Sequence, residues 1–175
     1  MPRRRDVRKI PFRRRRSGRT DYRARKKMLS SGQPRAVVRR SLNGLYVQIV
    51  EYAAIGDKVL CSASSHDLKG FGWKYKPDTT PAAYLVGYIA GKRATKSGIS
   101  GCVLDIGNYA STKGARVYGL LKGMLDAGLD VPHSNEIIPK EPRLYGEHIS
   151  KEIKAEVLRI KGEIDQKGVE VKRDA

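Results

Sequence analysis

The chain has 175 residues, of which 39% are hydrophobic, and a formal net charge of +18 at pH 7. This length suits one compact domain with extensions, and no apolar run approaches the roughly 18 residues that a membrane-spanning helix needs. Cys61 and Cys102 show neither CxxC nor metal-ligand spacing, so we expect buried free thiols rather than a disulfide framework or a zinc site. Because the N-terminus lacks the apolar stretch of a secretory signal, we expect a cytoplasmic protein.

Most of the positive charge lies at one end of the chain. Residues 1–40 contain seventeen Lys or Arg and two acidic residues, whereas residues 41–175 contain nineteen basic and sixteen acidic side chains. Such a block repels itself, so we expect residues 1–34 to form an arm that stays extended until a polyanion neutralises it. Nucleic acid is the leading candidate, because arginine forks match phosphate oxygens and neutralisation releases condensed counterions.

Aromatic side chains lie among the cations of this arm. Residues 13–27 hold nine Lys or Arg, interleaved with Phe12 and Tyr22, and either Thr20 or Asp21 is placed to cap a short helix through residues 25–29. Charge alone is also compatible with DNA, an anionic membrane or a nuclear import signal. A proline and a glycine oppose an amphipathic membrane helix, and no duplex-reading motif is present. Aromatics among arginines suit stacking on unpaired bases, so the sequence favours RNA.

Three strands are expected after the arm. Short runs of β-branched and aromatic residues alternate with turn signals, and Asn43-Gly44 is the strongest hairpin signal in the chain. The expected strands cover residues 36–40, 45–50 and 58–63. Tight turns between them predict an antiparallel meander.

Two helices and a fourth strand follow. Thr80 and Pro81 indicate a helix start, with threonine at the cap, and Gly98 ends this helix. Residues 102–106 are an apolar run typical of a buried strand, and a second helix is expected over residues 114–126. A strand that follows a helix in this way lies parallel to its neighbour. The predicted fold is therefore α/β, with a mixed sheet of a three-stranded antiparallel meander plus one parallel strand, packed by helices.

The C-terminal segment differs in kind. Apolar residues recur there every three or four positions among Lys and Glu, which predicts a helix with one narrow apolar seam; they are Ile149, Ile153, Val157, Ile160 and Ile164. Packing of this seam on the body is favoured over docking on a partner protein. The predicted organisation is an arm over 1–34, an α/β core over 35–134 and a helical extension over 135–175.

Support for catalysis is weak. Residues 107–114 follow a buried strand, but a phosphate-binding P-loop needs Gly before its Lys and Ser or Thr after it, and here Thr112 precedes Lys113. The three histidines lack metal-ligand spacing, and a Cys61–His66 nucleophile pair requires an exposed thiol. We expect no enzyme, cofactor or metal. The alternatives are an enzyme that uses residues 105–113, either nucleotide-dependent or RNA-modifying, and a generic RNA chaperone.

Several motifs together resemble one protein family. They are FRRRRSGRTDYRARKK (12–27), SSHDL (64–68), FGWK (71–74), TTPAAYLVGYIAGKRA (79–94), VLDIG (103–107) and GARVYGLLKGMLDAGLDVPHS (114–134). With them the chain is similar to the archaeal and eukaryotic branch of the universal L-eighteen family of large-subunit ribosomal proteins, which bind 5S ribosomal RNA. Its length is similar to that of archaeal members.

The resemblance implies an α/β body and a structural role in the ribosome. The expected function is to anchor 5S rRNA in the central protuberance of the large subunit. The expected partners are 5S rRNA, the large-subunit (23S) rRNA and the neighbouring L-five-family protein, with no membrane and no small-molecule substrate. The arm is expected to thread between the two RNAs.

The candidate RNA-binding residues form three groups. Those of the arm are Arg13, Arg14, Arg15, Arg16, Arg19, Thr20, Tyr22, Arg23, Arg25, Lys26 and Lys27. The first strand extends the basic surface through Arg35, Arg39 and Arg40. A second patch consists of Ser64, Ser65, His66, Lys69, Trp73 and Lys74. There, Trp73 is expected to be either an exposed stacking platform or a hydrophobic plug over the sheet.

Overall fold

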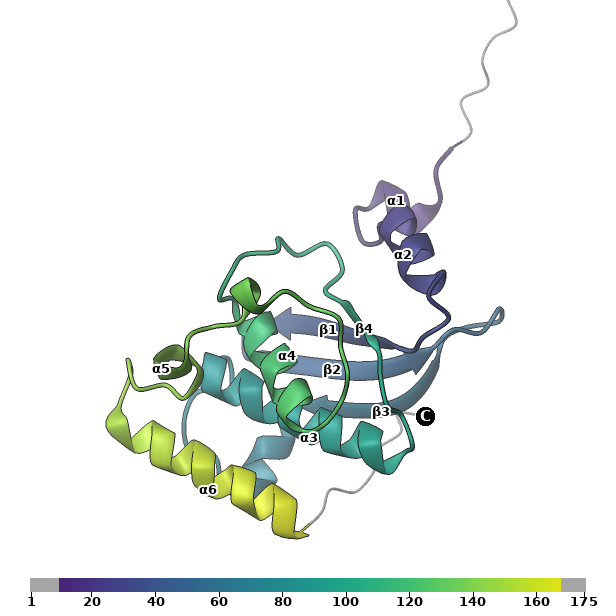
Figure 1. Cartoon of the computed structure of the whole chain (residues 1–175). Coiled ribbons are helices and arrows are strands. Elements are labelled where there is room, and N and C mark those ends of the chain that lie inside the picture. Colours follow the sequence, from purple (N-terminus) through teal and green to yellow (C-terminus); the bar gives the residue numbers. More distant parts are fainter. Residues whose placement is uncertain (1–9, 168–175) are drawn as a thin grey trace, which may run out of the picture.

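The computed structural model describes residues 10–167, and Figure 1 shows a four-stranded sheet covered by helices. The N-terminal part contains the short helices α1 (Arg13–Arg16) and α2 (Tyr22–Leu29). The body contains β1 (Arg35–Ser41), β2 (Gly44–Glu51), β3 (Lys58–Ser64), the 3-10 helix η1 (Asp67–Phe71), α3 (Thr80–Lys96), β4 (Val103–Asp105) and α4 (Arg116–Asp126). The C-terminal part contains the 3-10 helix η2 (Asn135–Ile137), α5 (Glu141–Leu144) and α6 (Lys151–Lys167).

The sheet has the strand order β3-β2-β1-β4. β1, β2 and β3 pair antiparallel, with Val38 opposite Val47, and β4 pairs parallel to β1, with Leu104 opposite Ala36. The predicted mixed sheet is therefore confirmed. Leu45, Val47 and Ile49 of β2 point into the core while Tyr46 remains exposed, as expected for a strand with one buried face. The alternation ends at a register shift between Ile49 and Val50, after which Val50 is buried and Glu51 is exposed.

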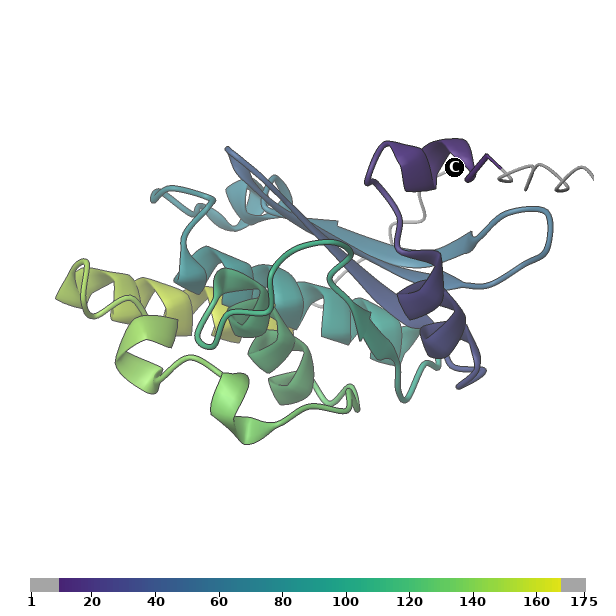
Figure 2. The same cartoon turned by 90° about the horizontal axis from the view of Figure 1, so that it is seen from above.

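Helices α3, α4 and α6 lie on one side of this sheet (Figure 2). Thr80 and Pro81 occupy the first two positions of α3 and Thr79 is the cap residue, one position earlier than predicted. A proline is tolerated there because the first N–H groups of a helix have no intrahelical partner. Gly98 ends the helix with a φ of 78°, in the left-handed region that favours glycine.

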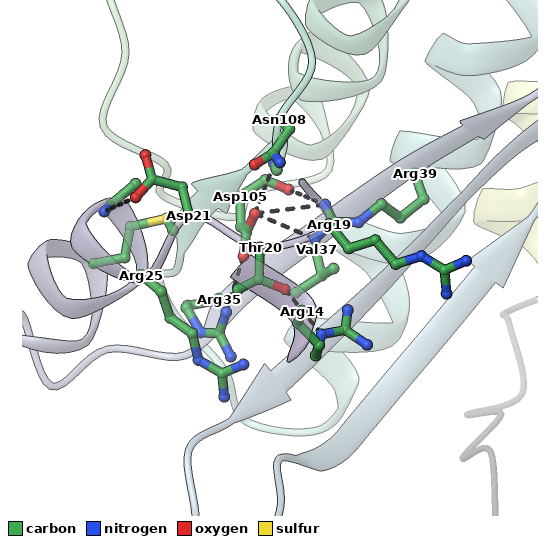
Figure 3. Close-up of a pocket in the computed structure, with 13 residues that line it drawn as sticks. Arg14, Arg19, Thr20, Asp21, Arg25, Arg35, Val37, Arg39, Asp105 and Asn108 are labelled. Carbon is green, nitrogen blue, oxygen red and sulfur yellow. Dashed lines mark hydrogen bonds and ion pairs between the residues drawn. The ribbon is translucent and has the colours of Figure 1, made fainter. Parts of the chain in front are cut away.

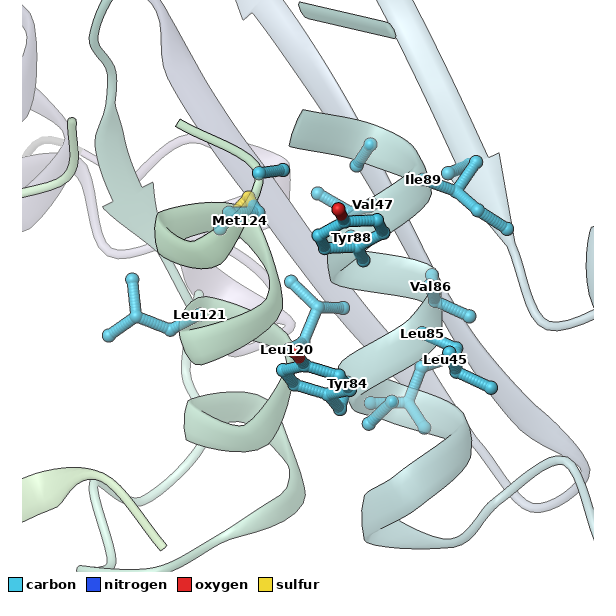
Figure 4. Packing of buried hydrophobic residues seen from close by; sticks show 14 of the residues in the cluster. Leu45, Val47, Tyr84, Leu85, Val86, Tyr88, Ile89, Leu120, Leu121 and Met124 are labelled. Atoms are coloured by element: carbon cyan, nitrogen blue, oxygen red, sulfur yellow. The ribbon is translucent and has the colours of Figure 1, made fainter. Parts of the chain in front are cut away.

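Helices α3 and α4 pack at very close range (Figure 4). A Cβ added to Gly87 of α3 would stand 1.9 Å from the backbone oxygen of Leu120, and one added to Gly123 of α4 would stand 2.0 Å from that of Tyr84. Gly91 and Gly119 occupy the neighbouring turns of the same two helices, where an added Cβ would stand 2.6 and 2.9 Å from side-chain atoms of Ala127 and Thr80. The pattern Gly-x-x-x-Gly on both helices lets the backbones touch, as small residues at this spacing do in other helix pairs. The sequence prediction did not use these glycines.

The C-terminal helix packs back on the body, as favoured from the sequence. Four residues of the predicted seam, Ile153, Val157, Ile160 and Ile164, are at most 2% exposed, whereas Ile149 precedes α6 and is 52% exposed. Polar bonds flank the seam: Asp165 accepts from the hydroxyl of Tyr88 at 2.8 Å and pairs with Lys92 at 2.7 Å. These contacts join α6 to α3.

The extended form expected of the basic arm is not confirmed. Residues 13–16 and 22–29 are helical, and α2 begins after Asp21, whose carboxylate accepts from the backbone N–H of Arg23 at 2.8 Å. Of the two predicted caps, Asp21 is thus the one used. Residues 1–9 of the predicted arm and 168–175 of the predicted C-terminal extension lie outside the described residues. None of the helices between residues 10 and 167 is long and apolar enough to cross a membrane.

Candidate nucleic-acid interface

Helices α1 and α2 present a dense group of cations to solvent. Neither helix contains an acidic residue. Among the predicted residues of the arm, Thr20 and Arg25 are half-buried; the exposed ones are Arg13, Arg14, Arg15, Arg16, Arg19, Tyr22, Arg23, Lys26 and Lys27. This part of the prediction corresponds to a continuous stretch of exposed positive charge, which is the electrostatic requirement for binding a polyanion.

One contact within the arm and two between the arm and the body hold it in place; Figure 3 shows the side chains of Arg14, Thr20, Arg25 and Asn108 that make them. The Arg14 Nε donates to the Thr20 hydroxyl at 2.9 Å, which joins α1 to the segment before α2. The side-chain amide of Asn108, from the loop after β4, donates to the carbonyl of Gly18. Arg25 of α2 donates to both carboxylate oxygens of Asp57, in the loop between β2 and β3, at 2.9 and 3.0 Å.

Alternating charges continue from this contact into the body. Asp57 also pairs with Arg35 at 2.6 Å, and Arg35 pairs with Asp105 at 2.9 Å. Asp105 lies 3.4 Å from Arg39 as well. The side chains of Arg35 and Asp105 are only 3% and 6% exposed, so the two charges neutralise each other inside the protein and Arg35 does not extend the exposed basic surface as expected.

The other two arginines of β1 lie nearer to the surface. The guanidinium of Arg39 packs on Gly107, where an added Cβ would stand 3.1 Å from it, and Gly107 has a φ of 64°. Arg40 is exposed and lies over the ring of Tyr109, 4.7 Å from the ring centroid. The Tyr109 hydroxyl donates to the Arg40 carbonyl at 3.0 Å. Stacking and the hydrogen bond therefore hold Arg40 and Tyr109 together.

Two hollows lie where the arm meets the body. The first, of about 120 Å³, is bounded by α2, β1 and the loop after β4, and the paired charges of Arg25, Arg35 and Asp105 line it (Figure 3). The second, of about 550 Å³, lies between the arm and the residues after Gly107. Its aromatic wall consists of Tyr22 and Tyr109.

The second predicted patch is divided by the fold. Trp73 is 8% exposed, packs edge-on against Tyr75 at 5.3 Å and belongs to the core, so it plugs the sheet and is not an exposed stacking platform. Ser65 is buried, and its hydroxyl accepts from the backbone N–H of Leu45 at 2.9 Å. Four side chains of the patch reach the surface, with Ser64 half-buried and the others exposed: Ser64, His66, Lys69 and Lys74.

Sequence reasoning missed several residues of the interface. The sequence predicts for Asp57 only a place in a turn, and for Asp105, Asn108 and Tyr109 only membership of a buried strand or of the loop that fails as a phosphate site. For Asn108 and Tyr109 the usable signal is their position after a buried strand, because side chains that follow the carboxyl end of a parallel strand gather at one edge of a sheet. Asp57 precedes the antiparallel strand β3, and no local signal singles it out.

The described residues offer little for catalysis. Burial raises the pKa of the Cys61 thiol to about 11 and that of the Cys102 thiol to about 12, so both are protonated at neutral pH, and the prediction of buried free thiols is confirmed. Asp105, the acidic residue of the alternative enzymatic loop, is engaged by two arginines. Within residues 10–167 no group of three or more His, Cys, Asp or Glu is placed to hold a metal ion.

Comparison with known proteins relates the chain to one family and to its curated members. The family model described as ribosomal large subunit proteins 60S L5 and 50S L18 matches residues 7–101 and 95–134. The large ribosomal subunit protein uL18 of Korarchaeum cryptofilum (strain OPF8) is 49% identical over 158 residues, which cover 90% of this chain and 80% of that protein.

Proposed function

The chain belongs to the uL18 family of large-subunit ribosomal proteins, and on this premise we propose that it binds 5S rRNA and attaches it to the large subunit within the central protuberance. As a member of this family it is a structural constituent of the large ribosomal subunit, and the family is not one of enzymes. The choice of 5S rRNA follows from the resemblance of residues 12–27 to the RNA-binding motif of the family.

The exposed charge of α1 and α2 is the observation that carries this proposal. Eight Lys or Arg side chains of residues 13–27 are exposed, and Asp21 is the one acidic residue among them. An exposed arginine exchanges its solution counterions for a phosphate without first leaving a protein carboxylate. The arm is also tied to the body through Arg25 and Asn108, so it presents these cations in a defined geometry before RNA arrives.

The proposed partners extend to a second RNA and to a protein. His66, Lys69 and Lys74 are exposed on and beside η1, far along the chain from the arm, and they support a second contact, which we assign to the large-subunit (23S) rRNA. The neighbouring L-five-family protein is the proposed protein partner, on the strength of the family resemblance alone.

The test is a titration of 5S rRNA and of an unrelated RNA of equal length with the full chain at several salt concentrations. We expect preference for 5S rRNA and a steep loss of affinity with salt. In the triple variant Arg13→Ala, Arg15→Ala and Arg16→Ala, the slope of log affinity against log salt should decrease by roughly 2–3, since each lost phosphate contact removes about 0.7–0.9. Arg14 is spared because it bonds Thr20.

A matched control removes the same charge elsewhere. Lys140, Arg143 and Lys151 are exposed in the C-terminal part, and their replacement by Ala should leave the slope unchanged. Equal losses in the two triple variants would show that the chain binds RNA through its net charge, as a generic RNA chaperone does. Equal affinity of the unaltered chain for both RNAs would refute the proposed function.

A further inference from the structure

We infer that the 550 Å³ cleft between the arm and the loop after β4 is a site for one unpaired nucleobase of the bound RNA, with Tyr22 and Tyr109 as its stacking walls. The inference rests on the proposed function, because it specifies how that RNA is held. The volume of the cleft lies within the range of small-ligand sites, roughly 300–1,000 Å³. Aromatic rings accept any base by stacking, and single-stranded RNA is bound in this way elsewhere.

Both tyrosines are braced from outside the cleft. The ring of Phe12 packs against that of Tyr22, with centroids 5.6 Å apart, and Phe12 does not line the cleft. The guanidinium of Arg40, likewise outside the lining, covers one face of Tyr109, and the Arg40 carbonyl accepts a hydrogen bond from the Tyr109 hydroxyl. Two rings held in place before binding lose little freedom when a base arrives, which is the condition for a site that contributes affinity.

The charges of the cleft fit a nucleotide with its base inside and its phosphates outside. Arg15 and Arg23, both exposed, line the cleft and supply cations for the flanking phosphates. Asp21 lines it as well, and backbone hydrogen bonds from Ala24 and Arg23 hold the pKa of Asp21 below its ordinary value, so it is anionic at neutral pH. A phosphate inside the cleft would meet this carboxylate, whereas a base presents neutral donors to it.

The arm and the loop close this site together. The amide of Asn108 donates to the Gly18 carbonyl, and both residues line the cleft next to Tyr109. The cleft therefore exists because the arm is docked, and neither segment supplies it alone.

The experiment compares Tyr109→Ala with the unaltered chain in 5S rRNA binding. The affinity should fall by roughly 5- to 150-fold, the range for losing one stacked base. The salt slope should stay unchanged, because no phosphate contact is lost. Tyr109→Phe keeps the ring and should bind within about twofold of the unaltered chain. Tyr52→Ala, which removes a 56% exposed tyrosine that does not line the cleft, is the matched control.

A second measurement identifies the base. Chemical probing of 5S rRNA should show one unpaired nucleotide that the unaltered chain protects and that becomes reactive with Tyr109→Ala and Tyr22→Ala but not with Tyr52→Ala. If the unaltered chain binds 5S rRNA specifically and Tyr109→Ala binds equally well, the base site is refuted and the proposed function stands. If the unaltered chain shows no preference for 5S rRNA, the proposed function fails and the base site with it.

Discussion

Replacing Gly87 by Ala should destabilise the protein, although alanine is the better helix former. An added Cβ would stand 1.9, 2.7 and 3.0 Å from the O, C and Cα atoms of Leu120, all of them backbone, so no side-chain rotation relieves the clash. Helices α3 and α4 must then separate, and overpacking of this kind usually costs about 1–3 kcal/mol and occasionally more. Because every clashing atom is backbone, we expect a gross cost of at least about 4 kcal/mol against a gain of about 1 kcal/mol in helix propensity.

The net loss of about 3 kcal/mol in the free energy of unfolding corresponds to a fall of roughly 6–12 °C in melting temperature for a chain of this size. Thermal unfolding followed by circular dichroism measures it. Gly162→Ala is the matched control, because Gly162 lies in α6 with nothing within 4 Å of its added Cβ, and this variant should gain about 0.5–1 kcal/mol. Gly87→Ala and Gly123→Ala open the same helix pair, so their double variant should lose less than the sum of the two. A Gly87→Ala protein as stable as Gly162→Ala would refute this account of the helix contact.

Three further changes test other parts of the structure. Asp105→Asn removes the buried carboxylate that pairs with Arg35 but leaves Arg35 paired with Asp57, so it should cost less than the roughly 3–5 kcal/mol of an uncompensated buried charge and more than the exposed pair Lys113–Glu136, which should cost under about 1 kcal/mol when broken, both measured by urea unfolding. The pKa of Asp21 is lower in the folded chain, so the stabilisation of α2 by its carboxylate is present above the ordinary aspartate pKa and is lost as the pH falls through the lowered value. Asparagine at this position still caps the helix, so Asp21→Asn should leave α2 formed at pH 7. The same variant should abolish the acidic transition in the amide signals of α2. The thiols of Cys61 and Cys102 should resist an aqueous thiol reagent at pH 8 until denaturant is added, and rapid labelling of the folded chain would contradict their burial.

The sequence specified the framework of the fold through local signals. Alternation along β2, the Asn43-Gly44 turn and the cap region before Pro81 depend on near neighbours, and each lies within a residue or so of its expected place. The buried face of α6 was also predictable, because apolar residues spaced by three or four positions form one face of a helix.

Features that depend on pairing across the fold were not accessible in the same way. The residues next to an arginine in the sequence do not reveal whether its side chain is exposed or buried. Arg35 is buried because Asp57 and Asp105, which are distant in sequence, both pair with it. Trp73 is similar: it lies in a segment where aromatic residues alternate with Gly and Lys, which fits either an exposed or a buried ring, and it fills the core beside Tyr75. Charge repulsion predicts an arm that is extended around its one short helix, whereas the Arg25–Asp57 pair, distant in sequence, offsets part of that repulsion and holds α2 on the body.

Asp57 and Asp105 already pair with arginines where the arm meets the body: Asp57 with Arg25 and Arg35, and Asp105 with Arg35. A phosphate that pairs with Arg25 must displace a carboxylate, so the gain is only the difference between two ion pairs, and Arg25 is less available to phosphate than an exposed arginine. Arg35 keeps Asp57 and Asp105 occupied whether or not RNA is present. The number of cations in the first forty residues therefore overstates the ions released on binding, and RNA affinity at physiological salt depends less on ionic strength than the charge of +18 suggests.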